Sequence, residues 1–174
     1  ELTIADIGCG HGDILRDVAK FGRKNGYKMK LIGMDANPTA IAYADELSTE
    51  FPELSFKTED IFSEAFKNRK FDVVLATLFL HHFKEAQLTS FLGNTLKQTK
   101  IGIVVNDLHR HKLAYYLFML LSVFIKNNMI IEDGLTSVLR GFKRNELAHI
   151  SKKLKVKPQI SWKWAFRFEW ILKY

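Results

Sequence analysis

The sequence predicts an α/β fold, with a seven-stranded, mostly parallel sheet, helices on both faces and an antiparallel hairpin at the C-terminal end. Strand and helix signals alternate along most of the chain, as they do in βαβ units. Residues 71–77 form an almost wholly apolar run, which is expected of a strand covered on both faces. Residues 159–173 alternate in polarity, which indicates the hairpin. With 174 residues, 47% of them hydrophobic, the chain suits one domain.

The elements of the first half follow in order along the chain. We expect strands at 3–7, 29–35, 54–57 and 71–77, and helices at 13–25, 39–50 and 84–97. Gly26 is expected to end the first helix, since glycine readily adopts the left-handed conformation beyond a helix end. Pro38 suits the start of the second helix, and Asn37 is placed to cap it.

The second half begins with a strand at 101–106, after which the pattern changes. Leu113–Ile125 holds thirteen residues of which only Ser122 is polar, and about 20 would be needed to span a bilayer. A helix that is apolar all round is buried, docked on a partner or lining an apolar cavity. We expect one of these, with a dimer face or a peripheral membrane contact left open. A loop ending at Gly141, a helix at 143–153 and the hairpin follow.

Charge and cysteine content limit the class of protein. Residues 1–96 carry 11 Lys and Arg against 14 Asp and Glu, whereas residues 97–174 carry 15 against 5. A basic half can serve nucleic acid, an anionic membrane surface or solubility, and the lysines at 152–157 are typical of a solvated helix end. The single cysteine, Cys9, excludes an internal disulfide or a thiolate metal cluster and is interpreted as a packing residue. A reducing cytoplasm is the expected compartment.

Residues 4–12 carry the strongest functional signal: Ile-Ala-Asp-Ile-Gly-Cys-Gly-His-Gly. Glycine lets the backbone turn tightly and brings N–H groups close to a ligand. Asp13 stands where a dinucleotide fingerprint needs its third glycine, and no Lys followed by Ser or Thr forms a P-loop. Asp6 would repel a pyrophosphate but suits an ammonium group. The loop therefore favours a cationic nucleoside that bears an amino acid.

Asp35 ends the second strand and can accept hydrogen bonds from both hydroxyls of a ribose. Dinucleotide enzymes use an acid at the same place, so this signal is shared. The alternative role, capping the next helix, suits Asn37 better.

On these residues the chain resembles the class I S-adenosylmethionine-dependent methyltransferases, which have a Rossmann-like fold. The resemblance implies S-adenosylmethionine as cofactor and a single methyltransferase domain over residues 1–174 that lacks N-terminal helices of a longer chain. It implies that Asp60 accepts from the adenine amine, although a plain turn is the alternative there, and that Thr77 and Leu78 lie beside the methionine portion. The cofactor-binding set is Asp6, Gly8, Cys9, Gly10, Asp35, Ala36, Asp60, Ile61, Thr77 and Leu78.

Two histidine-bearing segments are candidates for chemistry. His109 follows the fifth strand and could take a phenol proton, with Asp107 orienting it. Alternatively, Asp-x-His-x-His offers metal ligands or caps the next helix, although we expect no metal. Adjacent His81 and His82 are expected to point to different sides, with a structural role favoured over that of a general base. The substrate-binding candidates are His81, His82, Arg110, Tyr115, Tyr116 and Met119, where Arg110 holds an anion or bridges to Asp107.

The acceptor is the least specific inference. The segment 106–110, the apolar helix and the ending Trp164-Ala165-Phe166-Arg167 resemble bacterial small-molecule methyltransferases associated with type III polyketide synthases, which modify phenolic lipids, and more distantly the ubiquinone and menaquinone C-methyltransferases. This resemblance implies a small, apolar, phenolic or quinone-precursor acceptor. The loop after residue 77 lacks the prolines of enzymes that methylate nucleic-acid bases, so we expect no nucleic-acid partner. An RNA or protein methyltransferase and a non-catalytic binding module remain the alternatives.

Overall fold

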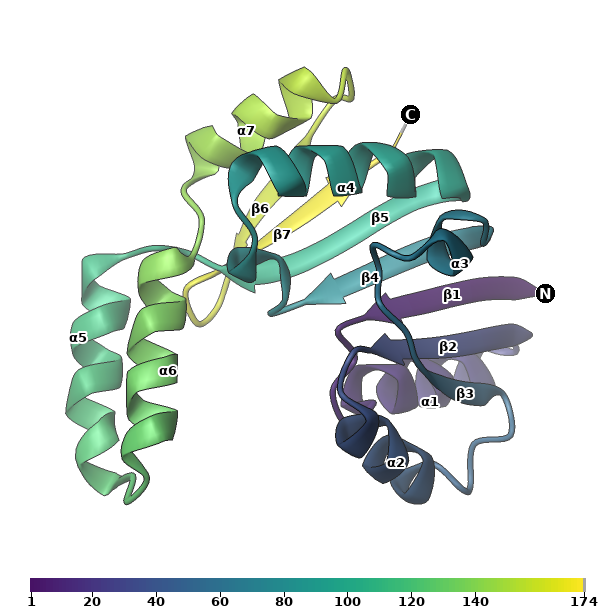
Figure 1. Ribbon diagram of the computed structural model, residues 1–174, viewed down its shortest axis with the longest axis horizontal. Helices are drawn as coiled ribbons and strands as arrows, with labels where there is room; N and C mark the ends of the chain where they lie inside the picture. The colour runs from purple at the N-terminus through teal and green to yellow at the C-terminus, as the bar shows by residue number, and fades with distance from the viewer. Residues whose placement is uncertain (174) are drawn as a thin grey trace.

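Seven strands form one sheet in the order β3-β2-β1-β4-β5-β7-β6 (Figure 1). They are β1 (Leu2–Ile7), β2 (Met29–Asp35), β3 (Leu54–Thr58), β4 (Phe71–Thr77), β5 (Thr99–Leu108), β6 (Gln159–Lys163) and β7 (Arg167–Leu172). The first five are parallel, and β7 pairs antiparallel with both β5 and β6. The structure is a computed structural model that describes residues 1–173, so Tyr174 lies outside it. The predicted fold class is confirmed.

Helices cover the sheet on both faces (Figure 1). On one face lie α1 (Asp13–Asn25) and α2 (Pro38–Leu47), and on the other α3 (Glu64–Lys67), α4 (Glu85–Gln98) and α7 (Arg144–Lys153). The larger core joins α4 and α7 to β4, β5 and β7, and Trp170 is fully buried within it. The smaller core packs Leu15 and Ala19 of α1 against Ile4 and Leu31. Both faces of the central strands are thereby covered, which explains the apolar run in β4.

Local signals set the boundaries of the first half. Gly26 caps α1 in the left-handed conformation, with its N–H donating to carbonyls of the last turn. Asn37 caps α2, and its side chain accepts from the N–H of Thr39 at 3.0 Å. The second helix was predicted to end at residue 50, but it ends at Leu47. The chain turns at Ser48, where Phe51 N–H donates to the Ser48 carbonyl.

The segment between β5 and α7 differs most from its prediction. Instead of one helix and a loop, it forms α5 (Lys112–Leu121), the short 3₁₀ turn η2 (Ser122–Phe124) and α6 (Asn128–Arg140). We call residues 112–140 the arm. Figure 1 shows its two helices side by side, projecting from the edge of the sheet where β5 ends. Gly134 permits this close approach, since a Cβ there would lie 2.3 Å from the Phe118 ring.

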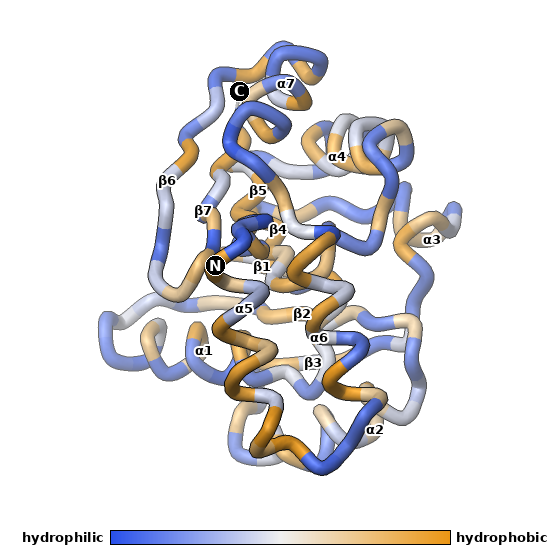
Figure 2. The backbone as a smooth tube through the Cα atoms, turned by 90° about the vertical axis from the view of Figure 1, so that its left-hand side faces the viewer, coloured by the Kyte–Doolittle hydropathy of each residue, from blue (hydrophilic) through white to orange (hydrophobic). Residues whose placement is uncertain are grey.

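Of the alternatives open for the apolar segment, burial in the core is not the one observed. No residue of α5 or α6 is buried, although the hydrophobic colouring runs along both helices (Figure 2). Within the described residues no helix has the length and apolarity needed to cross a bilayer.

Candidate functional site

The loop after β1 has the backbone geometry that its glycines predict. Gly8, Gly10 and Gly12 have φ of +67°, +51° and +76°, a region that favours glycine. The N–H groups of Gly8 and Cys9 donate to the Met34 carbonyl, which ties the loop to β2. A Cβ on Gly8 would lie 2.3 Å from the Phe79 ring, whereas one on Gly10 would meet no atom within 4 Å. The loop therefore bends around open space beside Gly10.

Asp35 stands at the end of β2, directly against this loop. Its Oδ2 accepts from Gly10 N–H at 3.0 Å, and its Oδ1 accepts from Asn37 N–H at 2.9 Å. Each carboxylate oxygen can accept a further bond, since it carries two lone pairs. Asp35 is only half-buried and Ala36 is exposed, so the carboxylate is positioned and accessible, as binding of ribose hydroxyls requires.

Asp6 is a buried acid with an unmatched oxygen. It is 2% exposed, and its Oδ1 has no hydrogen-bond partner. Burial, with the nearby Asp35 carboxylate, raises the pKa of Asp6 to about 7. Burial and the same acids raise the pKa of Cys9 to about 12, which supports packing rather than nucleophilic chemistry at this thiol. A cation at this point would offset the repulsion between the two carboxylates, so an ammonium-bearing cofactor fits the chain.

The ends of β3 and β4 place the remaining cofactor candidates at the same sheet edge. Asp60 is exposed, and its Oδ1 accepts from Phe62 N–H at 2.9 Å in a turn, while Ile61 is buried. Leu78 follows Thr77 with a φ of +51°, and its N–H donates to the Asn106 carbonyl at 2.9 Å. The strand ends therefore bring these predicted residues to the edge that carries the glycine loop.

Asp107 does not orient His109, and this part of the prediction is wrong. Its buried carboxylate accepts from His81 Nδ1 at 2.7 Å, from Leu80 N–H at 2.8 Å and from Leu108 N–H at 2.7 Å. Asp107 shares the buried face of β5 with Ile103 and Val105, and the turn Leu80–His82 lies against its carboxylate. β5 ends at Leu108, so His109 lies beyond the strand. His81 and His82 are also closer than expected, with ring centroids 4.2 Å apart.

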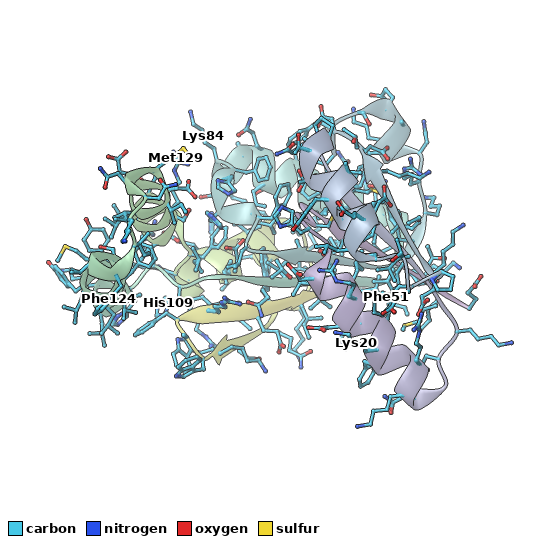
Figure 3. The ribbon with its side chains drawn as sticks, turned by 90° about the horizontal axis from the view of Figure 1, so that it is seen from below. Lys20, Phe51, Lys84, His109, Phe124 and Met129 are labelled. Carbon is cyan, nitrogen blue, oxygen red and sulfur yellow. The ribbon has the colours of Figure 1, made fainter. Side chains whose placement is uncertain are left out.

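His109 instead lies where the arm joins the sheet (Figure 3). Its ring is 4.6 Å from the Phe168 ring, and its Nδ1 is buried with no hydrogen-bond partner. Burial, followed by the positive charges that His111 and Lys143 can carry, lowers the pKa of His109. The neutral ring is therefore favoured at neutral pH. Arg110 forms an ion pair with Glu146 of α7 and not with Asp107.

Comparison with known proteins supports the same assignment. Residues 4–102 match the family model described as a methyltransferase domain. This is more than half of the chain. The chain belongs to this methyltransferase family. No curated protein matches it in sequence.

Solved structures share the fold of this methyltransferase at low sequence identity. The plantazolicin methyltransferase BpumL, in complex with SAH, has a TM-score of 0.74 and 17% identity, over 99% of this chain and 76% of that one. Magnesium protoporphyrin IX methyltransferase from Synechocystis PCC 6803, with bound SAH, has a TM-score of 0.68 and 14% identity, over 99% and 74%. A SAM-dependent methyltransferase from Aquifex aeolicus gives 0.71 and 14%, over 98% and 81%. These structures confirm the predicted fold, and the family match confirms the predicted enzyme class, a methyltransferase that uses S-adenosylmethionine.

Two grooves lie beside the arm, and the predicted substrate-binding residues line only the second of them. One, of about 540 Å³, lies between α5 and the β6–β7 turn and is lined by His109 and mainly by apolar residues; we call it the His109 groove. Its other lining residues are Leu108, Ala114, Leu117, Phe118, Leu120, Leu121, Val138, Trp162, Trp164, Ala165 and Phe166. The second, of about 380 Å³, contains Arg110, Tyr115 and Tyr116 with further basic residues. Met119 is exposed on α5 and lines neither groove.

Two features of the site were absent from the sequence prediction. One is the Asp107–His81 pair, whose members are 26 residues apart. The other is Asp133 of α6, whose charge acts on His82 and raises its pKa, against the larger lowering effects of burial and His81. Over residues 1–173, no group of three or more His, Cys, Asp or Glu residues is arranged to hold a metal ion.

Proposed function

We propose that this methyltransferase methylates an oxygen or carbon nucleophile of a small, apolar, phenolic or quinone-precursor acceptor. The observation that carries the proposal is the His109 groove, which combines an apolar lining with one titratable side chain, that of His109. Apolar pockets with a few placed polar groups are typical of small-molecule sites. No acidic or cationic side chain lines this groove, so it suits an uncharged ring better than a nucleic acid or a peptide.

The cofactor side of the reaction depends on the glycine loop and two acids. Bound S-adenosylmethionine supplies an electrophilic methyl group on a positively charged sulfur. Asp35 would bind the ribose hydroxyls, and Asp6 would face the ammonium of the methionine portion, where its unmatched Oδ1 finds a partner. Asp60, Ile61, Thr77 and Leu78 would contact the adenine and the methionine chain. Gly10 leaves the space that this requires.

His109 is the proposed general base. A neutral imidazole has one unprotonated ring nitrogen, which can accept the proton of a phenol as the oxygen attacks. The lowered pKa keeps His109 in that form at neutral pH. His109 follows β5, and β5 is joined to the Leu78 loop by the hydrogen bond from Leu78 N–H to the Asn106 carbonyl. The cofactor site and the His109 groove therefore lie at the same edge of the sheet. Asp107 has a positioning role in the proposal, because it fixes His81 and the turn that follows Leu78.

The proposal is tested with labelled S-adenosylmethionine and a set of phenols and quinone precursors, with total RNA as the competing acceptor. For an accepted phenol, His109→Gln should lower kcat by about 10²–10⁴-fold and leave cofactor affinity within twofold. The matched control is His149→Gln, since His149 is exposed on α7 and contacts Glu85 rather than the groove. Equal turnover of wild type and His109→Gln would remove the base. Methylation of RNA alone, with salt-sensitive RNA binding, would favour the alternative acceptor class.

A further inference from the structure

The outer end of the arm is an apolar surface exposed to solvent. Six large apolar side chains there are each more than half exposed, which is unusual for adjacent residues of a protein surface. They are Leu120, Leu121, Val123, Phe124, Met129 and Ile130, and we call them the tip. Phe124 and Val123 are the most exposed, at 84% and 78%. Figure 3 shows Phe124 and Met129 on the arm, with His109 at its base.

The one charge within the tip segment, residues 120–130, is a cation. Lys126, in the turn between η2 and α6, is the only charged residue from 113 to 131. Lys112 and Arg140, both exposed, stand at the two ends of the arm where it joins the sheet. The acids of the arm are Glu132 and Asp133, and Asp133 acts on His82 of the sheet edge. An exposed apolar patch with a cation inside it is suited to an interface that carries anionic groups.

The apolar surface is continuous from the tip to the proposed acceptor groove. Leu120 and Leu121 belong to the tip and also line the His109 groove. Across the groove, Trp164 and Trp162 of the β6–β7 hairpin are 87% and 50% exposed. Tryptophan favours the boundary between water and lipid, because its indole has an apolar body and a polar N–H. An apolar molecule entering at the tip would therefore have an apolar route to His109.

From these observations we propose that the tip docks on the surface of a bilayer containing anionic lipid and that the apolar acceptor enters the His109 groove from that bilayer. A second copy of the chain suits the tip less well. A symmetric contact would place Lys126 near its own copy, within a half of the chain that carries 15 basic against 5 acidic residues. The route of the acceptor rests on the proposed function, whereas docking itself needs neither cofactor nor turnover.

Docking is measured by co-sedimentation of the full-length protein with vesicles, in the absence of cofactor. We expect binding to phosphatidylcholine vesicles that contain phosphatidylglycerol, and weaker binding to phosphatidylcholine alone. The double variant Val123→Ser, Phe124→Ser should weaken binding at least about tenfold. Lys126→Glu should lower binding to the anionic vesicles and leave binding to the neutral ones unchanged.

The matched control is Ile101→Ser. Ile101 is 55% exposed and lies near the start of β5, at the opposite end of the strand from the arm. The vesicle binding of Ile101→Ser should equal that of the wild type. This control and the tip double variant should both retain cofactor affinity, which shows that they are folded. The proposal is overturned if the wild type binds neither vesicle, or if the control loses as much binding as the tip variant. It is also overturned if the tip variant abolishes a concentration-dependent dimer instead.

If vesicle binding is present and His109→Gln retains full turnover, docking holds and the proposed base fails. If His109→Gln is inactive and the wild type binds no vesicle, the proposed base is supported and the proposed docking fails. Wild-type turnover of an alkylated phenol should rise when the phenol is presented in anionic vesicles, and the tip variant should remove that rise.

Discussion

The glycine loop after β1 and the arm after β5 lie at the same edge of the sheet, but they are built differently. The loop is fixed by its own backbone: three left-handed glycines, and N–H groups that donate to Met34 and Asp35. The two helices of the arm have no buried residue and present apolar side chains to solvent. The comparison predicts that the loop tolerates little change of shape, whereas the arm can be altered without loss of the fold.

The largest expected effect of a change in the loop is that of Gly10→Val. The new side chain would occupy the open space beside Gly10, so we expect affinity for S-adenosylmethionine to fall at least about a hundredfold by calorimetry. The control is Gly26→Val, which has a similar positive φ and no atom within 4 Å of its Cβ. Both variants should lose about 1–2 kcal/mol of stability from the strained backbone. A Gly10→Val protein that binds the cofactor normally would refute the loop assignment.

Asp35→Ala should have a smaller effect on the same measurement. It removes the acceptor for two ribose hydroxyls and releases the Gly10 and Asn37 N–H groups, so affinity should fall about tenfold or more. The control is Asp17→Ala, which should leave the affinity unchanged, since Asp17 is exposed on α1 and pairs with Lys20. An affinity unchanged in Asp35→Ala would contradict the ribose role.

The ionisation of Asp6 links cofactor binding to pH. With its pKa raised to about 7 in the folded protein, Asp6 must lose a proton to face a cation. Affinity should therefore fall about fivefold from pH 7 to pH 6, and binding at pH 6 should release close to one proton, measured by calorimetry in buffers of different ionisation enthalpy. Asp6→Asn should remove the proton release; the same release from this variant would assign it to another group.

The same shift fixes the sign of a stability effect. The folded-state pKa lies above the unfolded value of 3.8, so ionised Asp6 destabilises the fold, and stability gained from its protonation is lost as pH rises through 7. The ceiling is about 4 kcal/mol, from a shift of about three pKa units. Asp6→Asn should therefore gain stability over the wild type at pH 8 and little at pH 4, as followed by urea unfolding.

The smallest effect is expected on the arm. Met129→Ser alters a side chain that is 74% exposed, so the free energy of unfolding should change by no more than about 0.5 kcal/mol. Leu92→Ala, at a fully buried position of α4, should cost about 2–5 kcal/mol in the same urea titration. If Met129→Ser destabilises the protein as much as Leu92→Ala does, the arm is part of the core and the contrast between the two regions fails.

The contrast also explains what could be predicted from sequence. The bounds of α1, β2 and β4 were predicted to the residue, because Gly26, the strand-ending Asp35 and the apolar run 71–77 are local signals. The helix α6 was missed because Gly134 weakens the helical pattern of its sequence. The glycine is needed for the close approach of Phe118, a tertiary contact that the local sequence does not show. The partner of Asp107 was missed for a similar cause: the sequence places Asp107 two residues from His109, but its partner His81 comes from a turn 26 residues earlier in the chain.

The fluorescence of the three tryptophans can report two separate events, global unfolding and binding at the His109 groove. Trp170 is enclosed in the core, and its Nε1 donates to Ser151 Oγ at 3.0 Å, while the other two indoles face solvent beside the His109 groove. An acrylamide-resistant emission should thus report global unfolding, and a quenchable, red-shifted one should report events at the groove. A ligand or lipid that covers the hairpin would shift the second emission to the blue and leave the first unchanged, without any label being attached.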